Sequence, residues 1–106
     1  MTKKRFKEIM DFQNKTFPNN TSLGKVFHLV DEVRELIDAL SIRSPDRNLE
    51  YADCIMLIYG AAATDGMSYE DIDKALEEKM KINYSREWTA PDENGVVRHI
   101  KKAVKG

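Results

Sequence analysis

Apolar side chains recur at spacings of three and four residues through most of the chain. The longest stripe begins after Thr21 or Ser22 and contains Val26, Leu29, Val30, Val33, Leu36, Ile37 and Leu40. That spacing places the side chains on one face of an α-helix, and the period-two alternation typical of a β-strand is absent. We therefore expect a helix here whose apolar stripe faces a hydrophobic core.

Three shorter stripes predict further helices. The first contains Phe6, Ile9, Met10 and Phe17, the third contains Leu49, Ala52, Ile55, Met56, Ala62 and Ala63, all expected to face inward, and the fourth contains Ile72, Ala75, Leu76 and Met80. Turn-forming residues separate them at Pro18, Ser44–Asp46 and Asp65–Gly66. Ser68, with Asp71 three residues later, predicts an N-terminal cap for the fourth helix. The chain therefore predicts an all-α fold, a four-helix-bundle-like domain.

The C-terminal segment has a different character. Residues 89–106 read as a loop followed by a short basic tail, which forms either a final helical turn or a mobile end. We expect the 106 residues to form a single domain, 1–106. A domain of this size has a modest core, so we also expect a homodimer or homotetramer that covers apolar faces.

Composition narrows the possible partners. The 17 basic and 18 acidic residues nearly cancel, so the balance favours neither a nucleic-acid nor a membrane surface, and we expect a small-molecule partner. The single cysteine excludes an internal disulfide framework and a cysteine-based zinc site. The basic start of the chain leads into acidic residues rather than an apolar block, so no secretory signal is predicted and we expect a cytoplasmic protein.

Two acidic pairs share the same three-residue spacing, Glu32 with Glu35 and Glu50 with Asp53. Residues three apart lie on one helix face, so two neighbouring helices could direct four carboxylates at one point. A carboxylate beside a core is costly unless a cation compensates it. The pattern favours a site for Mg²⁺, with Mn²⁺ as a substitute.

Other interpretations of the acidic residues remain open. Asp31, Glu32 and Glu35 could form a solvated helix face supported by Arg34 and nearby lysines. That interpretation suits Glu50 and Asp53 less well, because they lie at the start of a very apolar predicted helix. A di-iron carboxylate bundle is excluded because it needs histidines three residues after glutamates, and neither histidine has that position.

Lys79, Asn83 and Arg86 share one face of the fourth predicted helix. Two cations and an amide are typical of a phosphate-binding site, since arginine binds phosphate in a bidentate manner and lysine supplies a point charge. The alternative is a solvated helix end where basic residues complement the helix dipole.

These motifs resemble those of a known family. Asp31-Glu32-Val33-Arg34-Glu35 and Glu50-Tyr51-Ala52-Asp53 resemble the Glu-Glu-x-x-Glu and Glu-x-x-Asp signature of the MazG-like all-α nucleoside triphosphate pyrophosphohydrolases, with Asp31 where the signature has Glu. Lys79-Met80, Ile82-Asn83 and Arg86 resemble the run on the family's last helix. Residues 13–17, Gly24, His28, 86–88, Gly95 and 99–101 are similar to the dATP/dGTP diphosphohydrolase branch. The similarity covers roughly residues 9–102.

The resemblance implies Mg²⁺-dependent hydrolysis of deoxynucleoside triphosphates, dATP or dGTP, to the monophosphate and pyrophosphate. The chain has neither a Ser-His-Asp set nor a P-loop, which agrees with phosphoryl chemistry that needs charge neutralisation more than a protein nucleophile. The implied metal ligands are Glu32, Glu35, Glu50 and Asp53, with Glu35 or Asp31 activating water, Lys79, Asn83 and Arg86 holding phosphates, and Gln13 and His28 as candidates for the base. The competing hypothesis is a small, non-enzymatic helical interaction module with solvated acidic faces.

Overall fold

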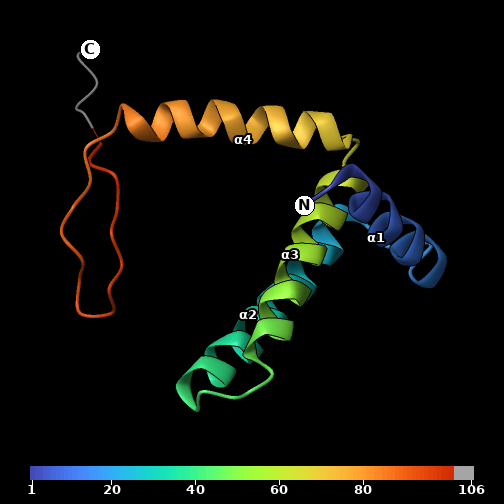
Figure 1. Cartoon of the computed structure of the whole chain (residues 1–106), viewed down its shortest axis with the longest axis horizontal. Coiled ribbons are helices and arrows are strands. Elements are labelled where there is room, and N and C mark those ends of the chain that lie inside the picture. The colour runs from blue at the N-terminus through green and yellow to red at the C-terminus, as the bar shows by residue number, and fades with distance from the viewer. Residues whose placement is uncertain (102–106) are drawn as a thin grey trace. The chain divides into compact units, whose positions relative to one another are not determined.

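The computed structural model describes residues 1–101, which contain four helices and no strand. The helices are α1 (Lys3–Thr16), α2 (Ser22–Ser41), α3 (Arg47–Thr64) and α4 (Tyr69–Tyr84) (Figure 1). Each coincides with one of the four apolar stripes, so the predicted all-α fold class is confirmed. No helix among the described residues has the length and apolar character needed to cross a membrane.

Local capping explains where two of the helices begin. The Thr21 hydroxyl accepts a 2.9 Å hydrogen bond from the Gly24 N–H at the start of α2. Before α4, the Asp71 N–H donates to Ser68 Oγ (3.1 Å) and the Ser68 N–H donates to Asp71 Oδ2 (2.9 Å). This reciprocal pair is the predicted cap, and it satisfies N–H groups that have no partner within the helix.

Backbone contacts divide the chain into two compact units, Met1–Ile72 and the residues from Asp73 on. In the first unit, α2 and α3 pack along one another and α1 packs against α3 (Figure 1). The single domain expected over residues 1–106 stays a prediction.

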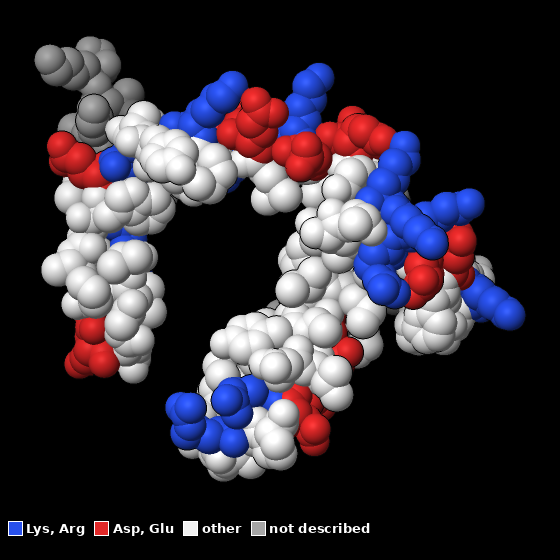
Figure 2. All heavy atoms as spheres, in the orientation of Figure 1, with Lys and Arg blue, Asp and Glu red and all other residues white. Residues whose placement is uncertain are grey.

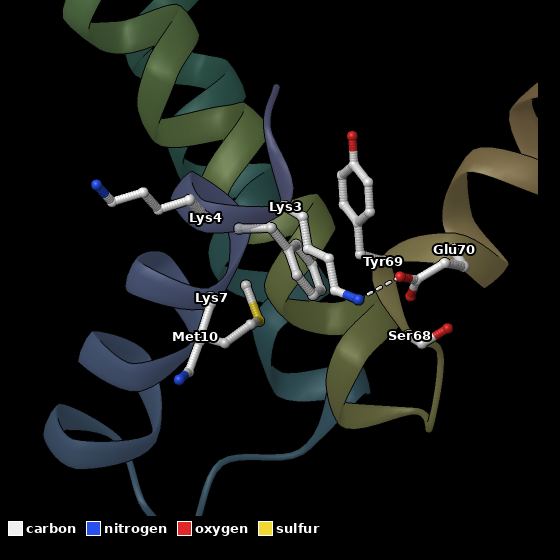
Figure 3. Close-up of a pocket in the computed structure, with 8 residues that line it drawn as sticks. Lys3, Lys4, Lys7, Met10, Ser68, Tyr69 and Glu70 are labelled. Atoms are coloured by element: carbon white, nitrogen blue, oxygen red, sulfur yellow. Dashed lines mark ion pairs between the residues drawn. The ribbon is translucent and has the colours of Figure 1, made fainter.

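Aromatic and polar contacts attach α1 to the start of α4 within this first unit. The ring of Phe6 lies 5.9 Å from that of Tyr59 and 5.7 Å from that of Tyr69, between centroids. Lys3 forms an ion pair with Glu70, and the Tyr69 hydroxyl donates to the Met1 carbonyl (2.8 Å). Lys3, Phe6, Tyr69 and Glu70 line an apolar cavity of about 570 Å³ with lysines at its rim (Figure 3).

Much of the predicted apolar stripes is exposed. The buried apolar side chains are Phe6, Ile9, Ala39, Leu57 and Ala61. In contrast, Val30 and Ile37 on α2 and Leu49 and Ile55 on α3 are 44%, 56%, 65% and 48% exposed. The predicted inward orientation is therefore wrong for these residues in the single chain, because a pair of helices buries only the strip of each that faces its partner. Figure 2 shows the resulting broad uncharged surface on α2 and α3.

In the second unit the chain folds back after α4 into a hairpin. The Thr89 N–H donates to the Arg98 carbonyl and the Ile100 N–H to the Glu87 carbonyl, each at 2.7 Å. The Asp92 carboxylate closes the turn by accepting N–H bonds from residues 94 and 96, both at 2.9 Å. The expected final helical turn is therefore wrong for residues 96–101, because their backbone pairs across the hairpin instead. The remainder of the predicted tail, residues 102–106, lies outside the described residues.

Candidate metal centre

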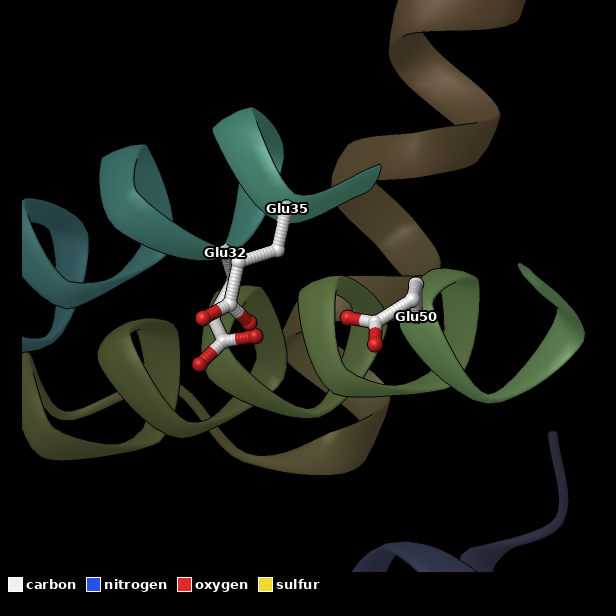
Figure 4. Close-up of side chains that lie close together, drawn as sticks. All are labelled: Glu32, Glu35 and Glu50. Carbon is white, nitrogen blue, oxygen red and sulfur yellow. The ribbon is translucent and has the colours of Figure 1, made fainter. Parts of the chain in front are cut away.

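Three carboxylates from two helices converge at one point. Glu32 and Glu35 lie on the same face of α2, and Glu50 lies in the first turn of α3. One oxygen from each lies within 4.8 Å of the others, and the side chains point toward one another (Figure 4). The packing of α2 on α3 thus brings the predicted pair Glu32 and Glu35 together with Glu50, one member of the second predicted pair.

Glu32 is largely enclosed by its surroundings. Its side chain is 17% exposed, and its Oε2 atom is buried with no hydrogen-bond partner among the described residues. Burial raises the pKa of Glu32, and a hydrogen bond with Glu35 and the charges of Glu35 and Asp53 raise it further. The His28 ring acts in the opposite sense, with Nε2 lying 3.3 Å from Glu32 Oε1.

Glu50 shows the same signs of an uncompensated negative charge. Its Oε2 atom is also buried without a hydrogen-bond partner in the described part of the chain. Burial raises the pKa of Glu50, followed by the charges of Glu35, Asp53 and Asp46. The cluster thus contains two buried carboxylate oxygens without hydrogen-bond donors, beside a third, exposed carboxylate. A hard divalent cation bound among them would compensate their negative charge. The donor set therefore fits Mg²⁺ or Mn²⁺.

The structure places the other two predicted acids differently. Asp53 lies one turn after Glu50 on α3, close enough for its charge to raise the pKa of both Glu32 and Glu50, but outside the group within 4.8 Å. The Asp31 side chain is 72% exposed and lies 3.8 Å from Arg34. Asp53 therefore adds to the negative field of the cluster, whereas Asp31 is solvated and paired.

A cavity of about 220 Å³ adjoins the acidic cluster. It is lined by Phe12, Gln13, Phe17, His28, Glu32, Asp53, Met56 and Leu57. Both predicted base-contacting residues, Gln13 and His28, thus lie beside two of the predicted metal ligands. The sequence interpretation did not predict that Phe12 lies in this cavity, and it counted Phe17 and Met56 only as apolar. The position of Phe12 next to Gln13 was the available signal, and the two phenylalanine rings form an edge-to-face pair at 6.5 Å.

The predicted phosphate-binding residues lie in the second unit. Because α4 ends at Tyr84, the shared helix face predicted for all three is wrong for Arg86. Arg86 is half-buried and lines a polar cavity, Lys79 is exposed, and Asn83 is half-buried with an Oδ1 atom that has no hydrogen-bond partner among residues 1–101. Asn83 also accepts a 3.4 Å hydrogen bond at its backbone carbonyl from the Trp88 indole N–H.

Comparison with known proteins decides the family. The profile of the dATP/dGTP pyrophosphohydrolase family matches residues 5–105. The chain belongs to this family. The predicted enzyme class, a nucleoside triphosphate pyrophosphohydrolase, is thereby confirmed.

Two relatives illustrate this membership. The chain is similar in structure to a MazG-like pyrophosphohydrolase of cyanophage S-2L, solved with dGDP and three catalytic Mn²⁺ ions per active site. The TM-score is 0.76 at 29% sequence identity, over 95% of this chain and 99% of that one. It is also 38% identical over 58 residues to the Eaa protein of Salmonella phage P22, and this match covers 55% of the chain but 18% of the Eaa protein.

Proposed function

We propose that this chain hydrolyses dATP and dGTP between the α- and β-phosphates, releasing the nucleoside monophosphate and pyrophosphate. The main support for this proposal is the cluster of three carboxylates in a member of the dATP/dGTP pyrophosphohydrolase family. Two of these carboxylates each have a buried oxygen without a hydrogen-bond donor among the described residues. Such a site would stabilise the charge of a triphosphate through a cation rather than through a protein nucleophile.

We assign the metal site to Glu32, Glu35, Glu50 and Asp53, with Mg²⁺ as the cation and Mn²⁺ as a substitute. The Mn²⁺ ions of the cyanophage enzyme and the oxygen-only donor set support this assignment. When bound, the cation neutralises phosphate charge and lowers the pKa of water. The carboxylates of this chain hold it where α2 meets α3.

Glu35 is our choice for the residue that accepts the proton of the attacking water. It is the exposed member of the cluster, so one of its oxygens can remain open to solvent. Asp31, the alternative, already pairs with Arg34 at 3.8 Å, which supports Glu35 over Asp31.

We propose that Lys79, Asn83 and Arg86 hold the phosphates, because a guanidinium, an ammonium and an amide offer donors to an anion without an acid among the three.

We propose further that the base enters the 220 Å³ cavity bounded by Gln13 and His28. The aromatic pair there offers faces for stacking. Within this cavity, His28 also orients the metal ligand Glu32.

We also propose that the active form is a homodimer or homotetramer. Leu23, Val26 and Ile58 are 63%, 40% and 50% exposed and line a groove of about 460 Å³ between α2 and α3. An apolar groove on a helix pair favours burial against a second copy, since the free energy gained is about 25 cal/mol per Å² of apolar surface. A nucleotide is then the small-molecule partner, and we propose a cytoplasmic location with no nucleic-acid or membrane partner.

The decisive experiment is a panel of nucleoside triphosphates incubated with Mg²⁺ and assayed for pyrophosphate. We expect dATP and dGTP to be hydrolysed. Asp53→Asn should lower turnover by more than about 100-fold, because losing a metal ligand lowers activity more than losing a residue that only orients a ligand. Asp38→Asn, an exposed acid on α2, is the matched control and should keep wild-type turnover. A folded wild-type protein that hydrolyses nothing on the panel would support the helical interaction module instead.

A further inference from the structure

The second unit contains a cavity that none of the assignments above uses as a whole. It measures about 440 Å³ and lies where the end of α4 meets the base of the hairpin. Its lining residues are Ser85, Arg86, Glu87, His99, Ile100 and Lys101. The 2.7 Å hydrogen bond from the Ile100 N–H to the Glu87 carbonyl joins its two walls. Backbone pairing therefore brings His99 and Lys101 beside Arg86.

Positive charge accumulates around the His99 ring. The charge of Arg86 is the largest cause of a lowered His99 pKa, followed by burial and by the charges of Lys101 and Lys79. Glu87 is the acid on the cavity wall, and Trp88 packs edge-to-face on the ring at 6.1 Å. Two cations of the cavity wall, Arg86 and Lys101, outnumber its single carboxylate, and the more distant charge of Lys79 adds to this positive surplus.

Two other cations of this unit, Arg98 and Lys81, are neutralised. Arg98 pairs with Asp92 at 3.0 Å, and Lys81 pairs with Glu77 at 3.5 Å. In contrast, Lys79, Arg86 and Lys101 form no ion pair with any described residue. The cations around His99 are thus available to an external anion.

The donors at this cavity are suited to a polyphosphate. A guanidinium binds two phosphate oxygens with fixed geometry, ammonium groups add charge, and an imidazole N–H adds a directed donor. Ser85 contributes less, because its hydroxyl already donates to the Ile82 carbonyl at 2.7 Å.

We propose that this cavity binds a pyrophosphate group and that His99 and Lys101 are phosphate ligands in addition to Lys79 and Arg86. Its use during turnover rests on the function proposed above, whereas its affinity for pyrophosphate does not.

The test is calorimetric titration of the whole metal-free chain with inorganic pyrophosphate. Lys101→Met should raise the dissociation constant about tenfold, the loss typical of one hydrogen bond to a charged group. Lys81→Met, which removes an equal charge from α4 outside the cavity, should change the dissociation constant less than about twofold. An equal loss of affinity in both variants would show that only the net charge of the protein matters, and it would overturn the proposal.

A second measurement needs no variant. Pyrophosphate bound at His99 should raise the pKa of that imidazole, since an added anion favours the charged ring. Proton NMR follows this pKa directly, and the fluorescence of Trp88, the single tryptophan of the chain, should change with it. An unchanged His99 pKa at saturating pyrophosphate would refute the site.

The two proposals fail separately. Hydrolysis of dATP without metal-free pyrophosphate binding would remove this inference and leave the enzyme assignment intact. Pyrophosphate binding at His99 without turnover of any nucleotide would remove the enzyme assignment and leave this inference intact.

Discussion

Gln13 on α1 donates a 2.9 Å hydrogen bond from Nε2 to the backbone carbonyl of Met56 on α3. The Gln13 side chain is buried, and its Oε1 atom packs against the backbone of Gly60 one turn further along α3. One amide thus attaches α1 to α3 at the wall of the cavity beside the metal centre. Gln13 has a structural role in addition to the nucleotide contact proposed for it.

This contact requires a glycine at position 60. A Cβ there would overlap the Gln13 amide, so we expect Gly60→Ala to lower the free energy of unfolding by about 1–3 kcal/mol. Urea denaturation gives the value. In a Gln13→Ala background the obstructing amide is gone, and the same substitution should cost less. Equal costs in both backgrounds would contradict the contact.

The carboxylate cluster should make stability depend on pH and metal. The folded-state pKa values of Glu32 and Glu50 lie above the unfolded value of 4.5, so the folded chain binds protons more tightly. Their contribution to stability is present below pH 4.5 and is lost as pH rises through the raised values. We therefore expect Mg²⁺ to raise the melting temperature more at pH 8 than at pH 5.

Thermal melts with EDTA or Mg²⁺ across that range measure this dependence. Glu50→Gln should weaken the pH dependence of the metal-free chain, whereas Asp38→Asn should leave it unchanged. A Glu50→Gln protein with the wild-type pH profile and the wild-type response to Mg²⁺ would show that Glu50 is not part of the centre.

The apolar groove on α2 and α3 should determine the oligomeric state. Ile58→Asp introduces a charge that association would have to bury, which costs several kcal/mol per interface. We expect sedimentation velocity to show the wild type as a dimer or tetramer and the variant as a monomer. Ile42→Asp is the control, because Ile42 is 78% exposed after the end of α2 and outside the groove. A monomeric wild type would disprove the proposed assembly.

The stability of the hairpin should depend on the Asp92 carboxylate. The N–H of Val96 lowers the pKa of Asp92 most, followed by the Arg98 side chain and the N–H of Asn94. Its contribution is therefore present above the unfolded pKa of 3.8 and is lost as pH falls through the lower folded value.

At neutral pH, Asp92→Ala should speed amide exchange at Val96 and Ile100 about tenfold, because the turn loses three charge-assisted hydrogen bonds. Hydrogen exchange followed by NMR measures this rate. Glu93→Ala, one residue on, should have no effect, and similar exchange in both variants would rule out a special role for Asp92.

The amino-acid sequence by itself determined the local features. Helix positions followed from apolar spacing and from the cap at Ser68, because these interactions connect residues a few positions apart. The same helical geometry determined that Glu32 and Glu35 share a face. The motifs were also specific enough to indicate the family that the profile confirms.

Only the tertiary structure decided which helices meet and at what register. The position of Glu50 beside Glu32, the exposure of Val30 and Ile37, and the pairing of Trp88 with His99 all depend on contacts between segments distant in the sequence. Local periodicity carries no information on the offset between two packed helices, and a basic, β-branched segment shows no partner until the chain folds back. Packing, rather than residue type, therefore determined which carboxylates and which cations could act together.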